Sequence, residues 1–134
     1  MRREVLMREV VKGIWLGGWH DCKNQMPTIH IGEECPFRFM DERNRTYDLR
    51  DYDEDAPQIL QILDECEPFI TKWRQVDPGV LVHCTVGVSR SATLVFLYLI
   101  RVGEIKTRRD FEKLYPSWFP NMGFQRLFTR LRID

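Results

Sequence analysis

The sequence predicts a compact α/β domain in which a central, mixed and mostly parallel sheet is flanked by helices. Segments with strand patterns are mixed with segments with helix patterns along the chain. Val80–Val82 is a continuous apolar run, which is typical of a strand buried on both faces. After a short loop, residues 91–100 are apolar nearly all round, which predicts a central buried helix. No repeat or linker interrupts the 134 residues, so we expect one domain, residues 1–134.

The other elements follow from local patterns in chain order. Apolar residues from Ile59 to Trp73 recur at helical spacing, and Pro57 opens this predicted helix. Asp77-Pro78-Gly79 then ends the helix and turns the chain. The remaining predicted elements are strands at 14–16, 28–31 and 46–49, a loop at 38–44, a helix capped by Thr107 and Asp110, and a last amphipathic helix at 122–131.

The composition narrows the class of protein. Twenty basic and twenty acidic side chains cancel, which argues against binding of long nucleic acids. We find no apolar segment long enough to span a bilayer and no signal peptide, so we expect no membrane insertion. We expect an intracellular, cytoplasmic monomer, with the nucleus as the alternative compartment, and four reduced cysteines. Because the cysteines form no Cys-x-x-C pair and His20 and His30 lack ligand spacing, we predict no metal and no cofactor.

The segment Val80 to Ser91, VLVHCTVGVSRS, carries the chemistry. The buried strand delivers Cys84 to its C-terminal end, and Arg90 stands where the next helix begins. Between them, backbone N–H groups of the loop can form an anion cradle at the helix N-terminus. The planar fork of Arg90 matches two phosphate oxygens. The predicted phosphate-binding residues are Thr85, Val86, Gly87, Val88, Ser89 and Arg90, with Gly87 allowing the tight loop.

Cys84 is the candidate nucleophile of this site. A helix N-terminus and a nearby cation favour the thiolate form of a cysteine, so we expect Cys84 to attack without a general base. The hydroxyl of Ser91 can donate to the sulfur and help it leave when water cleaves the cysteinyl-phosphate. We expect His83 to order the loop through hydrogen bonds. The predicted reaction is cysteine-dependent hydrolysis of a phosphate ester.

These residues resemble a known family. HCTVGVSRS matches the His-Cys, five residues, Arg-Ser/Thr signature of the protein-tyrosine phosphatase superfamily. Its continuation, Ser89–Thr93, is similar to the dual-specificity phosphatases, and most to their MAP-kinase phosphatase branch. Ile29–Pro36 resembles the family's strand ending in Cys-Pro, and Pro120-Asn121 with Phe124 resembles its Pro-Asn motif. This resemblance, from near Ile14 to Leu127, implies phosphorylated proteins as substrates and Asn121 as a brace of the phosphate loop.

The resemblance also implies a general acid, an aspartate about thirty residues before the cysteine. Asp51, Asp53 and Asp55 lie there. Alignment on Phe69 favours Asp53 and brings Ile59 into register too, with Asp51 as the next candidate.

Two departures from the family pattern stand out. The segment between Leu16 and Thr28 is short, so we expect the family's first helix to be truncated or missing, and Val86 replaces a common alanine. Cys22 or Cys35 could oxidise onto Cys84 and protect it, whereas Cys66 is expected in the core.

Two alternatives to a protein phosphatase of dual specificity stay open. The same chemistry could serve a phosphoinositide or an RNA 5′-phosphate. However, residues 85–89 carry no cation, and the acidic run 51–55 should repel polyanions. A phosphate-binding pseudophosphatase is the other alternative, although Cys84, Arg90 and Ser91 are all present.

Overall fold

The structure, a computed structural model, describes residues 7–32, 35–85 and 89–134. Its centre is a five-stranded sheet in the order β1-β2-β5-β3-β4. The β2–β5, β5–β3 and β3–β4 pairs are parallel, and β1 is an antiparallel edge strand on β2. This arrangement confirms the predicted mixed, mostly parallel sheet. The strands are β1 (Arg8–Val11), β2 (Ile14–Gly18), β3 (Thr28–Ile31), β4 (Asn44–Tyr47) and β5 (Val80–Cys84).

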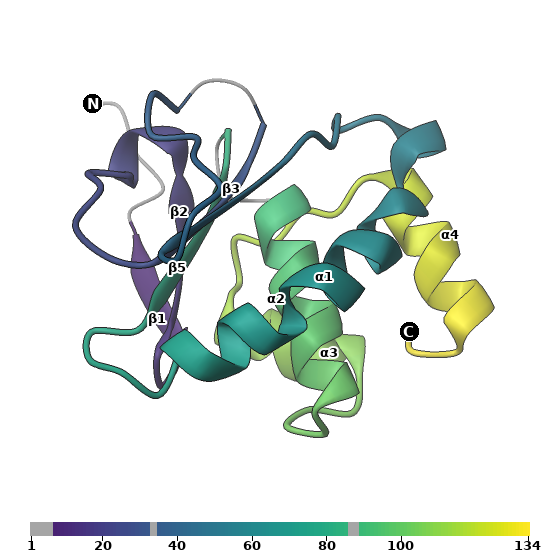
Figure 1. The fold of residues 1–134 in the computed structure, drawn as a ribbon. Helices are drawn as coiled ribbons and strands as arrows, with labels where there is room; N and C mark the ends of the chain where they lie inside the picture. Colours follow the sequence, from purple (N-terminus) through teal and green to yellow (C-terminus); the bar gives the residue numbers. More distant parts are fainter. Residues whose placement is uncertain (1–6, 33–34, 86–88) are drawn as a thin grey trace, which may run out of the picture.

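Four α-helices lie on one side of the sheet (Figure 1). The central helix α2 is buried from Ser91 to Leu99, as its apolar sequence predicts, and packs against β5 and α1. The helices are α1 (Gln58–Trp73), α2 (Arg90–Arg101), α3 (Arg108–Leu114) and α4 (Met122–Leu131), with short 3-10 helices η1 (Trp19–Asp21) and η2 (Asp53–Asp55).

The two faces of β5 belong to different hydrophobic clusters. Val82 and Cys84 join the main core beneath the helices. Leu81, whose side chain alternates to the opposite face of the strand, joins a second cluster with Cys22 and Cys35. The second cluster is built from the segments just before and just after β3. The sheet therefore has a helix-covered face and a face covered by connecting segments.

Most predicted elements are confirmed, and the differences are local. Between β2 and β3 the structure has only the 3-10 helix η1, which agrees with a missing first helix. Strand β4 begins at Asn44, within the predicted loop, because its backbone pairs in parallel with β3. Strand β1 (Arg8–Val11) was not predicted. Its two exposed residues stand next to each other, so its sequence lacks the alternation typical of a strand. Its pairing with β2 makes it a strand.

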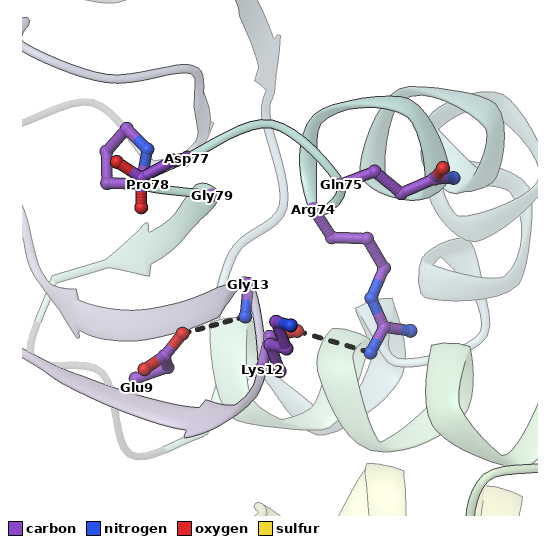
Figure 2. Close-up of a pocket in the computed structure, with 8 residues that line it drawn as sticks. All are labelled: Glu9, Lys12, Gly13, Arg74, Gln75, Asp77, Pro78 and Gly79. Carbon is purple, nitrogen blue, oxygen red and sulfur yellow. Dashed lines mark hydrogen bonds between the residues drawn. The ribbon is translucent and has the colours of Figure 1, made fainter.

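A cleft of about 490 Å³ lies at the N-terminal end of β5, at the opposite end of the strand from Cys84 (Figure 2). Its polar groups fasten two turns together: Gly13 N–H donates to Glu9, and Arg74 donates to the carbonyl of Lys12. Gly79 has a φ of 116°, and a Cβ there would lie 2.3 Å from the Gly13 oxygen. This close approach requires glycine, so we read the cleft as a structural junction.

Candidate active site

Cys84 lies buried at the C-terminal end of β5, where α2 begins. Its sulfur is 3.2 Å from the hydroxyl oxygen of Ser91, and the Ser91 backbone N–H donates to it at 3.5 Å. That N–H is one of the first donors of a helix, which have no acceptor within the helix itself. The sulfur thus faces the positive end of the α2 dipole, where a bound anion would also be stabilised.

Arg90, the first residue of α2, is oriented from two sides. Its Nη1 donates to the carbonyl of Leu49 at 2.8 Å, and its Nη2 donates to the Thr85 hydroxyl at 2.7 Å. Its Nε is buried, and it has no hydrogen-bond partner among the described residues. A cleft of about 310 Å³, lined in part by Asp51 and Tyr52, adjoins it. The guanidinium is therefore held in place with a donor left to bind an anion.

Only the two ends of the predicted phosphate loop belong to the described residues. The Thr85 carbonyl accepts a hydrogen bond from the Trp19 N–H at 3.2 Å, and the Ser89 hydroxyl donates to Asp51 at 3.0 Å. Val86, Gly87 and Val88 lie outside the described residues, so their part in the anion cradle stays a prediction. Both ends of the loop are tied to other segments of the chain.

The structure separates the candidate acids. Asp51 Oδ1 accepts hydrogen bonds from Ser89 at 3.0 Å and from Asn121 at 2.7 Å. Asp53 instead accepts from the Gly123 N–H at 3.1 Å, and its other oxygen is 3.5 Å from Arg126. Thus Asp51, and not Asp53, contacts the described ends of the phosphate loop, through Ser89.

The third aspartate of the acidic run has a structural partner. Asp55 is buried and forms an ion pair with Arg50, with 2.6 Å between Asp55 Oδ2 and Arg50 Nε. This pairing favours a structural role for Asp55.

Helix α4 holds both of the other aspartates. Asn121 caps the helix through its Oδ1, which accepts from the Phe124 N–H at 2.9 Å, while its Nδ2 donates to Asp51. Asn121 therefore reaches the phosphate loop through Asp51. A Cβ on Gly123 would lie 2.3 Å from the Asp53 carbonyl oxygen, so η2 can pack on α4 only because this residue is glycine. The alignment on Phe69, which favoured Asp53 as the acid, could not predict this packing of η2 on α4.

His83 faces away from Cys84, in a group of four buried side chains that we call the Cys2His2 cluster: Cys22, His30, Cys35 and His83. Their potential ligand atoms all lie within 4.8 Å of one another. The sequence predicted no metal site because the cysteines lack Cys-x-x-C spacing. The available signal was different: His30 and His83 are register partners on the adjacent parallel strands β3 and β5.

Burial shifts the pKa of two members of this cluster, Cys22 and His30. It raises the pKa of the Cys22 thiol to about 12, and the neighbouring Cys35 acts in the same direction. It also lowers the pKa of His30. In the absence of a cation, both groups are therefore neutral. Because Cys22 and Cys35 pack on the opposite face of the sheet from Cys84, the geometry does not favour a protective disulfide with Cys84.

Comparisons with known proteins agree with this geometry. The family model "Dual specificity phosphatase, catalytic domain" matches residues 22–132. MAP kinase phosphatase with leucine-rich repeats protein 3 of Dictyostelium discoideum is 33% identical over 132 residues, covering 87% of this chain and 15% of the relative. Protein phosphatase Slingshot homolog 3 of Homo sapiens is 37% identical over 91 residues, covering 66% of this chain and 14% of the relative.

Solved structures show the same fold. The crystal structure of DUSP15 superposes with a TM-score of 0.75 at 26% identity, covering 93% of this chain and 86% of that one. The human tyrosine phosphatase-like serine/threonine/tyrosine-interacting protein superposes with a TM-score of 0.74 at 24% identity, covering 98% and 97%.

The matches to the curated relatives cover only a small part of those proteins. The chain spans 15% and 14% of the length of the two curated relatives named above. None of the helices in the described part of the chain has the length and apolar character to cross a membrane. The match to the family model over residues 22–132 shows that this chain belongs to the dual-specificity phosphatase family.

Proposed function

We propose that this domain hydrolyses phosphotyrosine, and also phosphoserine and phosphothreonine, in protein substrates through a cysteinyl-phosphate on Cys84. The observation that carries the proposal is the Cys84 sulfur at the N-terminus of α2, 3.2 Å from the Ser91 hydroxyl. A thiol in the core of an ordinary strand has no need of such donors. Membership of the dual-specificity phosphatase family supports the same reaction.

The reaction divides into two displacements at phosphorus. In the first, the Cys84 sulfur forms a bond to phosphorus while the bond to the substrate oxygen breaks and an aspartic acid protonates that oxygen. In the second, water attacks the phosphorus and gives a proton to the same aspartate, and the sulfur–phosphorus bond breaks. Arg90 binds the phosphoryl oxygens throughout, and the Ser91 hydroxyl donates to the departing sulfur.

We assign the general acid to Asp53, from its register with Phe69 and Ile59, and a positioning role to Asp51. Asp51 ties the segment that carries Asp53 to the phosphate loop through Ser89. For proton transfer, Asp53 must leave Gly123 and reach the leaving oxygen. The contacts of Asp51 with the loop make it the competing candidate, and the two assignments predict different variants to be defective.

The cleft beside Arg90 supports phosphoproteins over polyanionic substrates. Its described lining includes Asp51, which repels additional phosphates, and the cation Arg50, while the charge of Asp48 is offset by an ion pair with Arg38. Arg50 is paired with Asp55, which offsets its charge. We expect this cleft of about 310 Å³ to admit the shorter phosphoserine and phosphothreonine side chains as well as phosphotyrosine.

Steady-state assays test the proposal directly. The purified domain should hydrolyse an aryl phosphate and matched phosphotyrosine, phosphoserine and phosphothreonine peptides, and orthovanadate should inhibit. Cys84→Ser should lose turnover but retain bound phosphoprotein, while the buried Cys66→Ser serves as the matched thiol control. Unchanged turnover in Cys84→Ser, or a large preference for phosphoinositides or RNA 5′-phosphates, would overturn it. Phosphopeptide binding with no turnover would instead identify a pseudophosphatase.

A further inference from the structure

The Cys2His2 cluster lies on the face of the sheet away from Cys84, and the proposed phosphatase reaction makes no use of its thiols. His30 and His83 project from neighbouring strands, while Cys22 precedes β3 and Cys35 follows it. All four side chains are buried. The cluster therefore joins three segments of the chain at one point behind the catalytic strand.

The distances within the cluster are close to those of a tetrahedral metal site. Ligand atoms at the usual zinc–sulfur and zinc–nitrogen bond lengths are separated from one another by roughly 3.3 to 3.8 Å. Here the Cys22 sulfur is 3.8 Å from His30 Nδ1, and His30 Nδ1 is 2.9 Å from His83 Nε2. Since all four potential ligand atoms lie within 4.8 Å of one another, small side-chain movements suffice to surround one ion.

The outer contacts of His30 present the correct nitrogen to the cluster. Asn44 Nδ2 donates to Asp41 at 3.0 Å, so the amide oxygen of Asn44 points the other way, to His30. His30 Nε2 must then donate to that oxygen, at 2.7 Å, and its Nδ1 carries the lone pair that faces the cysteines. Metal-binding histidines are commonly oriented by such a second hydrogen bond.

Both sulfurs receive a backbone hydrogen bond from the residue two positions later. The Phe37 N–H donates to the Cys35 sulfur at 3.3 Å, and the Asn24 N–H bonds to Cys22. Asn24 adopts a left-handed conformation with a φ of 57°, which turns the chain back toward its cysteine. Backbone donors to sulfur stabilise the negative charge of a thiolate ligand.

We propose that the Cys2His2 cluster binds one structural zinc ion. Thiolate and imidazole ligands in a tetrahedral set are those that zinc prefers, and four protein ligands leave no open position for substrate. Binding releases the two thiol protons to solvent, and the proton on His83 Nε2 passes to the other nitrogen of the same ring. Two thiolates neutralise the divalent cation, so the filled site carries no net charge among its apolar neighbours Met26 and Leu81.

Cobalt titration tests the site without relying on catalysis. Reduced, metal-free protein carrying Cys84→Ser, which removes the reactive thiol, is titrated with Co²⁺ and then with Zn²⁺. We expect the intense visible absorption and sulfur-to-cobalt charge-transfer bands of a tetrahedral thiolate site, saturating at one equivalent and displaced by Zn²⁺. Absence of these bands, or a Cys22–Cys35 disulfide in protein purified under reducing conditions, would overturn the proposal.

Matched variants assign the signal to the cluster. Cys22→Ser and Cys35→Ser should abolish it and the rise in unfolding temperature that Zn²⁺ produces, while Cys66→Ser, a buried thiol in the other core cluster, should keep both. If the cysteine variants do not fold, Asn44→Ala decides, because loss of the second hydrogen bond on His30 should weaken binding about 10- to 100-fold. Equal stabilisation of Cys22→Ser and Cys66→Ser, or unchanged affinity in Asn44→Ala, contradicts the site. A negative outcome leaves the phosphatase proposal intact, because that reaction uses the other face.

Discussion

The two faces of the sheet both carry buried cysteines, Cys84 on the helix-covered face and Cys22 with Cys35 on the other. Cys84 is 2% exposed and Cys22 is 4% exposed, so burial does not distinguish them. Their hydrogen-bond partners do. Cys84 faces a hydroxyl and an N–H at the start of a helix, whereas Cys22 faces a histidine, another thiol and the N–H of Asn24 in a turn. The immediate donors of a buried thiol, more than its depth, therefore indicate whether it is suited to attack phosphorus or to hold a metal.

The largest expected effect is the loss of turnover when Cys84 is replaced, and it tests whether Cys84 alone among the buried cysteines acts as the nucleophile. Cys84→Ser should lower turnover of an aryl phosphate by at least about four orders of magnitude, because the hydroxyl is a poor nucleophile without a base. Cys66→Ser should retain turnover, since its thiol lies in the core on α1. The measurement is kcat at saturating substrate, with circular dichroism to confirm folding. A Cys84→Ser protein with appreciable turnover would place the nucleophile elsewhere.

The next largest expected effect is slower hydrolysis when the proposed general acid, Asp53, is replaced. Asp53→Asn should slow hydrolysis of phosphotyrosine peptides by about 10²- to 10⁴-fold, because the leaving phenoxide then departs unprotonated. An aryl phosphate with an acidic leaving group should be spared, because such a leaving group needs little protonation.

Asp51→Asn serves as the matched variant. It loses charge in the contact with Ser89, so it should slow both substrates similarly. If the dependence on leaving group appears in Asp51→Asn and is absent from Asp53→Asn, the register on Phe69 is wrong and Asp51 is the acid.

Ser91→Ala tests whether the hydroxyl donor beside Cys84 suits this thiol to act as nucleophile and leaving group. A hydrogen bond to a charged group contributes about 1.5 to 3 kcal/mol, so loss of the hydroxyl should slow release of the sulfur about 10- to 100-fold. Cysteinyl-phosphate should accumulate, as a burst of product in rapid-quench experiments. Ser89→Ala, which changes a contact to Asp51 and not to sulfur, should show no such accumulation. Equal bursts in both variants would separate Ser91 from the leaving step.

The smallest effect tests how far α4 supports the catalytic face. Asn121→Ala removes both the helix cap and the donor to Asp51, whereas Asn121→Ser can keep the cap. We expect Asn121→Ala to lower the free energy of unfolding by about 1 kcal/mol, and Asn121→Ser by less. Both should reduce turnover to a similar degree, because both lose the contact to Asp51. Full activity in Asn121→Ala would show that Asp51 is held adequately by Ser89.

The sequence was sufficient for the parts of the molecule that local patterns determine. The strand before Cys84, the buried helix after Arg90 and the cap at Thr107 all occupy their predicted places, because apolar period and capping chemistry act over a few residues. The edge strand β1 (Arg8–Val11) was not predicted, since only its partner makes it a strand.

Two features of the site depended on contacts between distant segments. The alignment that selected Asp53 as the acid could not show that Gly123 allows Asp53 to pack against α4, while Asp51 contacts the loop through Ser89. Cysteine spacing along the chain likewise concealed a cluster assembled across two parallel strands through His30 and His83. In both cases the deciding neighbours come from elements far apart in sequence.

The position of β5 at the centre of the sheet has a consequence for how the protein acquires activity. Gly18 pairs with Cys84, and His30 pairs with His83, so the strand that carries Cys84 is flanked by segments from the first quarter of the chain. Such pairings form slowly, because a long stretch of chain must be ordered before they contribute. Helices α1 and α2 rely on local contacts and can form sooner. During refolding, we therefore expect the helical signal to recover before the enzymatic one.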